Sequence, residues 1–122
     1  MRLLLCEDYH AFAEIALDAL RGAGHKVSSV ARNGHAAMDL VRAEDWDAVV
    51  TDYDLGWGPN GGQVAQAALH AGAPLVVLWS SIPRRKDELP DEKMAEALAF
   101  HMLEKSDIKR VVALLDELEG TL

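Results

Sequence analysis

Two short apolar runs of the chain end in acidic residues. Residues 48–51 are followed by Asp52, and residues 3–6 are followed by Glu7 and Asp8. If both runs are neighbouring parallel strands, these three carboxylates converge at one edge of a sheet. Carboxylates so close together repel each other unless a cation sits between them. The pattern therefore predicts a magnesium site beside Asp52, an aspartate that can accept a phosphoryl group.

The elements that must position these residues alternate along the chain. Apolar runs predict strands at 2–6, 26–31, 47–52, 75–79 and 100–103. Apolar residues at helical spacing predict helices at 10–23, 35–43, 62–71, 91–99 and 107–119. The glycine-rich stretch 56–62 and the polar stretch 80–90 are expected to be loops. Strands that alternate with helices predict a parallel sheet with helices on both faces.

Composition limits the class of protein. A chain of 122 residues, half of them hydrophobic, predicts a single domain over 1–122 with its own core. The single cysteine, Cys6, cannot form an internal disulfide, which favours a reduced, cytoplasmic location. The net charge of −8 argues against a surface that binds nucleic acid. The first apolar run is too short to be a signal peptide or to span a membrane.

Two further strand ends carry residues suited to phosphoryl transfer. Ser80 and Ser81 end the fourth predicted strand, and Lys105 follows the fifth. Ligands of doubly wound sheets bind beyond the carboxyl ends of the strands. Each of these residues alone is a weak signal, but their joint occurrence at four strand ends is a much stronger one.

Over essentially its whole length, the pattern resembles the receiver domain of two-component response regulators. In that family an acidic pair ends strand one, a phosphorylated aspartate ends strand three, a threonine or serine ends strand four, and a lysine ends strand five. The matching residues here are Glu7 and Asp8, Asp52, Ser80, and Lys105. The resemblance implies an α/β fold of the flavodoxin-like receiver type, a doubly wound five-stranded parallel sheet of order 2-1-3-4-5 with five helices.

The resemblance also implies a role for each residue. Asp52 would attack phosphorus and become an acyl phosphate. Asp8 and Asp52 would bind Mg²⁺ directly, Glu7 would act through water, and the backbone carbonyl of Asp54 would complete the protein ligands. Lys105 would contact a phosphoryl oxygen as a point charge.

The switch residues follow from the same resemblance. Ser80 would donate a hydrogen bond to the phosphoryl group and move toward it. Counting from Pro74, the hydroxyl position could instead fall on Trp79, and Ser80 is preferred because an indole cannot replace a hydroxyl there. The aromatic switch position on the fifth strand is occupied by Met102. Where the family usually has a cis proline after its lysine, this chain has Ser106, for which a trans bond is expected.

The implied function is that of a stand-alone receiver. It would take a phosphoryl group from a histidine kinase or a histidine phosphotransfer protein and would signal to a downstream protein or pass the group on. It would catalyse only its own phosphorylation and dephosphorylation. Two alternatives stay open. Asp52 and Asp54 also resemble the first motif of haloacid-dehalogenase-type phosphatases, and the unusual stretches 53–62 and 100–106 also fit an interaction module that needs no phosphate.

Overall fold

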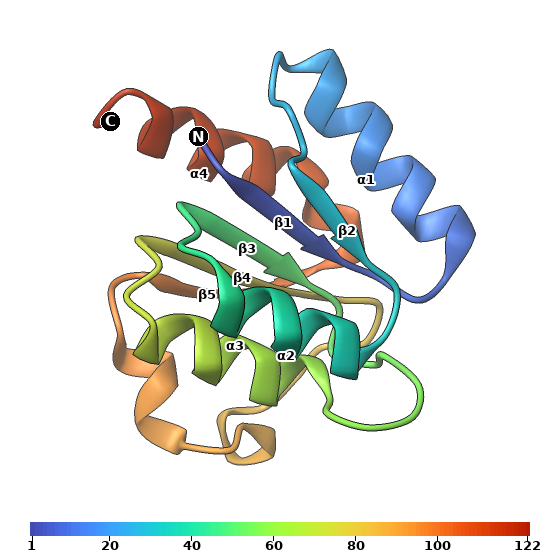
Figure 1. The fold of residues 1–122 in the computed structure, drawn as a ribbon, viewed down its shortest axis with the longest axis vertical. Coiled ribbons are helices and arrows are strands. Elements are labelled where there is room, and N and C mark those ends of the chain that lie inside the picture. The colour runs from blue at the N-terminus through green and yellow to red at the C-terminus, as the bar shows by residue number, and fades with distance from the viewer.

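The computed structural model describes all 122 residues, and a five-stranded parallel sheet forms its centre (Figure 1). The strands are β1 (Leu3–Cys6), β2 (Ser29–Ala31), β3 (Ala48–Thr51), β4 (Leu75–Ser80) and β5 (Phe100–Glu104). The helices are α1 (His10–Gly22), α2 (Gly34–Ala43), α3 (Gly61–His70) and α4 (Ile108–Glu119). The strand order is β2-β1-β3-β4-β5, so the predicted sheet is confirmed.

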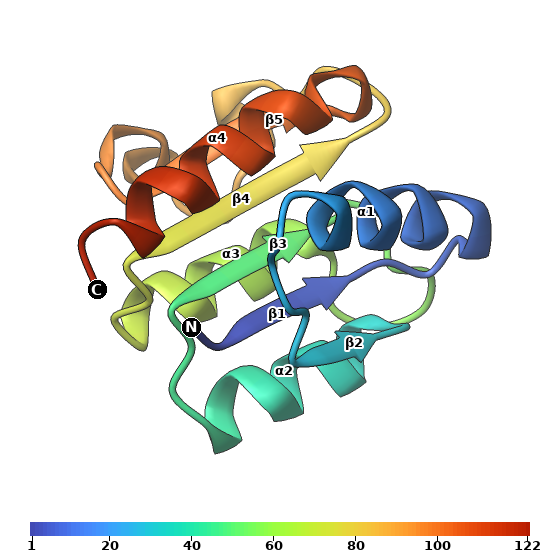
Figure 2. The same cartoon turned by 90° about the horizontal axis from the view of Figure 1, so that it is seen from above.

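The sheet is buried on both faces because its central strands are apolar at all positions except Thr51 and Ser80 at their carboxyl ends. Helices α1 and α4 cover one face, and α2 and α3 cover the other (Figure 2). Side chains alternate between the two faces along each strand. Val77 and Trp79 thus belong to the core under α1 and α4, whereas Val76 and Leu78 belong to the core under α2 and α3.

The register of the sheet sets which residues meet at its carboxyl edge. Cys6 pairs with Thr51, and Thr51 pairs with Leu78. One further residue along each strand brings Glu7, Asp52 and Trp79 side by side. Because these three positions continue the alternation of the strands, they lie on the face covered by α1 and α4.

The predicted helix at 91–99 is wrong, and the sheet is covered by four helices rather than five. The connection from β4 to β5 contains only two 3₁₀ turns, η1 (Lys86–Glu88) and η2 (Glu92–Glu96). Within η2 only Met94 is buried, and Leu98 just beyond it is 98% exposed. A single buried side chain offers too small an apolar face to hold a helix against the sheet.

Smaller differences concern the ends of elements. The third helix begins at Gly61, so the predicted loop 56–62 is shorter than expected. The second strand begins at Ser29 rather than at Lys26. The Lys105–Ser106 bond is trans, as predicted, because the chain has no cis peptide bond. No helix has the length and apolar character needed to cross a lipid bilayer.

Candidate functional site

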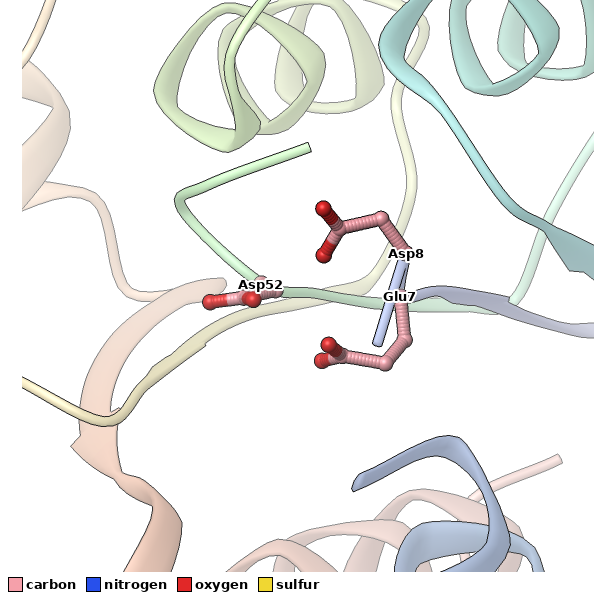
Figure 3. A group of neighbouring side chains, drawn as sticks. All are labelled: Glu7, Asp8 and Asp52. Atoms are coloured by element: carbon pink, nitrogen blue, oxygen red, sulfur yellow. The ribbon is translucent and has the colours of Figure 1, made fainter. Parts of the chain in front are cut away.

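Three carboxylates meet at the carboxyl edge of the sheet. Glu7 and Asp8 follow β1, Asp52 follows β3, and one oxygen from each lies within 4.8 Å of the others. Figure 3 shows the Glu7 and Asp8 side chains leaving the chain on opposite sides, with both carboxylates reaching toward Asp52. Glu7 is fully buried, Asp52 is 8% exposed, and Asp8 is open to solvent. The structure therefore brings together the acidic residues that the sequence singled out.

The backbone holds two of these carboxylates in place. The sheet ladder continues past the strands, since the Glu7 N–H donates to the Ala31 carbonyl and the Asp52 N–H donates to the Cys6 carbonyl, each at 2.9 Å. Beyond Asp52, the N–H of Gly61 donates to the Tyr53 carbonyl at 2.6 Å. A Cβ on residue 61 would lie only 1.7 Å from the Asp52 carbonyl oxygen, so the start of α3 can approach Asp52 only with glycine there.

Lys105 completes the site from the end of β5. Its ammonium forms an ion pair with Glu7 and lies 3.9 Å from an Asp52 carboxylate oxygen. The same ammonium lies over two rings, 3.7 Å from the centroid of Trp79 and 4.6 Å from that of Phe12. With its side chain only 9% exposed, Lys105 is a buried cation of the acidic cluster.

Burial makes the charged form of this cluster costly. It raises the pKa of Glu7 to about 7, with the nearby Asp52 carboxylate adding to the rise and Lys105 opposing it. Burial also raises the pKa of Asp52, again against the effect of Lys105. The three carboxylates repel one another, and a cation between them would offset this repulsion. Carboxylate oxygens are hard ligands, so this donor set fits Mg²⁺. The residues present therefore agree with the predicted cofactor.

Ser80 lies away from the acidic cluster. Its hydroxyl accepts weak hydrogen bonds, both at 3.4 Å, from the N–H of Ile82 and from Nε of Arg84. It lines a pocket of about 280 Å³ together with Leu78 and Met102. Ser80 and Met102 thus share the face opposite to Asp52, and the switch roles assigned to them stay predictions.

Trp79 occupies the place beside Asp52 that a hydroxyl was expected to fill. It is fully buried, its indole Nε1 has no hydrogen-bond partner, and its ring contacts Lys105. The count from Pro74 was the signal in the sequence that pointed to this position. Phe12, the second ring against Lys105, gave no such signal, because its place in the sequence predicts only the apolar face of a helix.

Asp54 lies in the loop that follows the cluster. Its carboxylate accepts a hydrogen bond from the N–H of Gly56 at 3.3 Å and is not among the converging carboxylates. The predicted contribution of Asp54 is its backbone carbonyl rather than its side chain, and that contribution stays a prediction.

Solved structures of other proteins have a similar fold, whereas sequence comparisons find no relative. No protein-family model matches the chain, and no curated protein does so either. Among solved structures, the signal receiver domain of the putative response regulator NarL from Mycobacterium tuberculosis is similar, with 28% identity and a TM-score of 0.73. The match covers 98% of this chain and 96% of that one.

Two further structures match over similar lengths. A CheY-like response regulator receiver domain from Methylobacillus flagellatus is 22% identical, with a TM-score of 0.72 and coverage of 97% of this chain and 98% of that one. The signal receiver domain of an HD domain-containing protein from Pseudomonas fluorescens Pf-5 is 16% identical, with a TM-score of 0.76 and coverage of 98% and 94%. The chain therefore has the fold of CheY-like response-regulator receiver domains.

Proposed function

We propose that the domain accepts a phosphoryl group on Asp52, in a magnesium-dependent reaction, from a histidine kinase or a histidine phosphotransfer protein. The observation that carries the proposal is the meeting of four charged groups at one sheet edge. Glu7, Asp8 and Asp52 converge within 4.8 Å, and Lys105 lies 3.9 Å from Asp52. Phosphoryl transfer depends mainly on positioning and on the stabilisation of negative charge, and both requirements are met by this arrangement.

The chain's own groups have distinct parts in such a reaction. A carboxylate oxygen of Asp52 forms the new bond to phosphorus, while the bond from phosphorus to the donor breaks and the donor leaves with its electron pair. Asp8, Asp52 and Glu7 would hold Mg²⁺, which when bound supplies positive charge against the attacking carboxylate and the phosphoryl oxygens. Lys105 supplies a second positive charge within reach of the same oxygens.

The product would be read by other proteins. We propose that the phosphorylated domain acts through protein contacts or passes the group on in a phosphorelay, as the receiver fold implies. The net charge of −8 disfavours a nucleic-acid partner and supports the proposal of protein partners.

A small phosphodonor tests the proposal without any partner. Purified protein is incubated with acetyl phosphate, with and without MgCl₂, and phosphate incorporation is followed by intact-protein mass spectrometry and phosphate-affinity gels. We expect one acyl phosphate, labile to acid, base and hydroxylamine, in the wild type with Mg²⁺, and none in Asp52→Asn. Asp54→Asn is the matched control, since its carboxylate lies outside the cluster, and it should still be modified. Equal incorporation in Asp52→Asn would contradict the assignment.

One observation favours a second candidate, a receiver-like interaction module that works without phosphate. The position beside Asp52 on β4 holds Trp79, whose buried ring cannot move toward a phosphoryl group as a hydroxyl does. If the wild type takes up no phosphate from acetyl phosphate or phosphoramidate while it still binds Mg²⁺, this candidate replaces the first. The phosphatase alternative gains no support, because the similar structures are receiver domains.

A further inference from the structure

The surroundings of Lys105 differ on its polar and apolar sides. Its ammonium pairs with Glu7 on one side and faces the rings of Trp79 and Phe12 on the other. Trp79 is fully buried between the sheet and its covering helices, and its ring centroid lies 3.7 Å from the ammonium nitrogen. A cation over the face of a tryptophan is attracted by the ring's negative charge distribution, and the attraction grows when water is excluded.

The two rings come from different elements and depend on the fold for their placement. Phe12 lies on α1, and its ring stacks edge to face with Tyr9 at a centroid distance of 5.1 Å. Trp79 is fixed by the register of β4, which pairs it with Leu103 on β5. Lys105 follows the end of β5, two residues after Leu103, so it continues the alternation of the strand and lies on the same side as Leu103 and Trp79.

We propose that Trp79 and Phe12 are positioning residues that clamp the Lys105 ammonium between their faces and Glu7, within reach of a phosphoryl group on Asp52. This inference rests on the proposed function. It assigns to Trp79 a role that differs from that of the hydroxyl expected there: the indole contacts the lysine, and the lysine contacts the phosphoryl oxygens. Glu7 alone does not fix the cation, since a lysine carries a flexible stem and a freely rotating ammonium. The rings exclude the alternative positions.

The first arm of the test measures the order of Lys105 in the protein without phosphodonor or metal. Side-chain ¹⁵N relaxation of the Lys105 ammonium is compared in the wild type, Trp79→Leu and Trp79→Phe. Leucine is apolar but smaller and has no aromatic face, whereas phenylalanine keeps an aromatic face. We expect the order parameter of the ammonium to fall in Trp79→Leu and to be largely kept in Trp79→Phe. Equal order in both variants and the wild type would overturn the clamp.

Phe12→Leu and Phe12→Tyr form a second, milder pair in case Trp79→Leu does not fold. Phe12 is only partly buried, so its replacement leaves most of the core in place. We expect the order of the Lys105 ammonium to fall in Phe12→Leu and to be kept in Phe12→Tyr. Loss in both variants, or in neither, would show that the ring face does not hold the lysine.

The second arm measures binding of beryllofluoride, a phosphoryl mimic, in saturating Mg²⁺. Trp79→Leu should bind the mimic about tenfold more weakly, within the range expected for a partly desolvated cation–π contact, with Mg²⁺ affinity unchanged. Trp79→Phe should recover most of this loss. Weakened Mg²⁺ binding in Trp79→Leu would place the role of Trp79 in the metal site and overturn the proposal.

The two arms separate this inference from the proposed function. If the wild type neither binds beryllofluoride nor accepts phosphate, the proposed function fails, while the relaxation arm still decides whether the rings hold Lys105. If the wild type is phosphorylated and the order of Lys105 does not depend on the rings, only the clamp fails.

Discussion

The carboxyl edge of the sheet and the segment 81–99 carry charged residues held in opposite ways. At the sheet edge the pair between Lys105 and Glu7 is buried, with side chains 9% and 0% exposed. In segment 81–99 the pair between Lys86 and Glu96 joins side chains 51% and 69% exposed. Exposed pairs contribute little to stability, whereas a buried charge that loses its partner is costly. The charged groups of the site are therefore fixed by burial and register, whereas the Lys86–Glu96 pair of the segment is held far more loosely.

One contact links the two regions directly. The Arg84 guanidinium of the segment lies 4.0 Å from the ring centroid of Tyr53, the residue after Asp52, and pairs with Glu88 at 3.0 Å. Since Arg84 also donates to Ser80, this residue attaches the start of the segment to the loop beyond the site.

The largest expected difference comes from removing the two lysines. Lys105→Met leaves Glu7 buried without its partner, which should cost roughly 3 kcal/mol of unfolding free energy at pH 8. Lys86→Met is the matched exposed change and should cost less than about 1 kcal/mol. Urea denaturation of both variants measures the contrast. Losses of similar size would show that the two regions are not held differently.

A backbone change at the site should have the next largest effect. Gly61→Ala places a methyl group against the Asp52 carbonyl, so the start of α3 must shift, at a cost of roughly 2–3 kcal/mol. Gly22→Ala is the control, because a Cβ at Gly22, the last residue of α1, meets no atom within 4 Å. Thermal unfolding followed by circular dichroism should show a lower midpoint for Gly61→Ala and an unchanged midpoint for Gly22→Ala. A tolerated Gly61→Ala would mean that the site loop is not fixed by this approach.

A smaller effect is expected from pH, because Lys105 offsets part of the cost of ionising Glu7. The pKa of Glu7 is raised from 4.5 in the unfolded chain to about 7 in the folded protein. Between these values the folded state binds more protons than the unfolded state, so the contribution of Glu7 to stability falls as pH rises through this window and then levels off. The raised pKa of Asp52 acts in the same direction.

The measurement is the unfolding free energy of wild type minus that of Glu7→Gln at a series of pH values without divalent cations. The difference should fall between about pH 4.5 and 7. Added Mg²⁺ should raise the stability of the wild type most at the upper end, where the carboxylates are ionised. A flat difference would show that Glu7 is ionised in the fold as readily as in the unfolded chain.

The sheet edge was largely predictable from sequence, since strands buried on both faces read as continuous apolar runs and their ends are marked by charge. Asp52 and Glu7 follow such runs directly, and Lys105 follows the run 100–103 after one residue, Glu104. It was harder to predict which residue of β4 lies beside Asp52. The strand continues past the apolar Trp79 to Ser80, and no charged residue marks its end. An error of one residue in the register turns every side chain to the other face of the sheet. Sequence alone thus left Trp79 and Ser80 as alternatives beside Asp52.

Segment 81–99 was the least predictable region. Met94 and the alanines around it have helix-like spacing, but a helix there needs an apolar face that the sheet can cover. The Asp91 side chain accepts a hydrogen bond from the N–H of Lys93 at 2.9 Å, which satisfies the start of a short 3₁₀ turn instead. The spacing of apolar residues alone does not show whether a local cap or packing against the sheet decides the structure of such a segment.

Segment 81–99 also acts as a tether, because it connects β4 to β5. Glu7 and Asp52 lie before it in the chain and Lys105 lies after it, so the segment sets the effective concentration of the cation at the acidic cluster. The closure entropy of a flexible tether changes slowly with length, by about 0.6 kcal/mol for each doubling. The pairing of β4 with β5, rather than the length of the tether, decides where Lys105 arrives. This connection is accordingly the place where the chain can gain or lose residues, or carry an inserted module, while the geometry of its charged site is preserved.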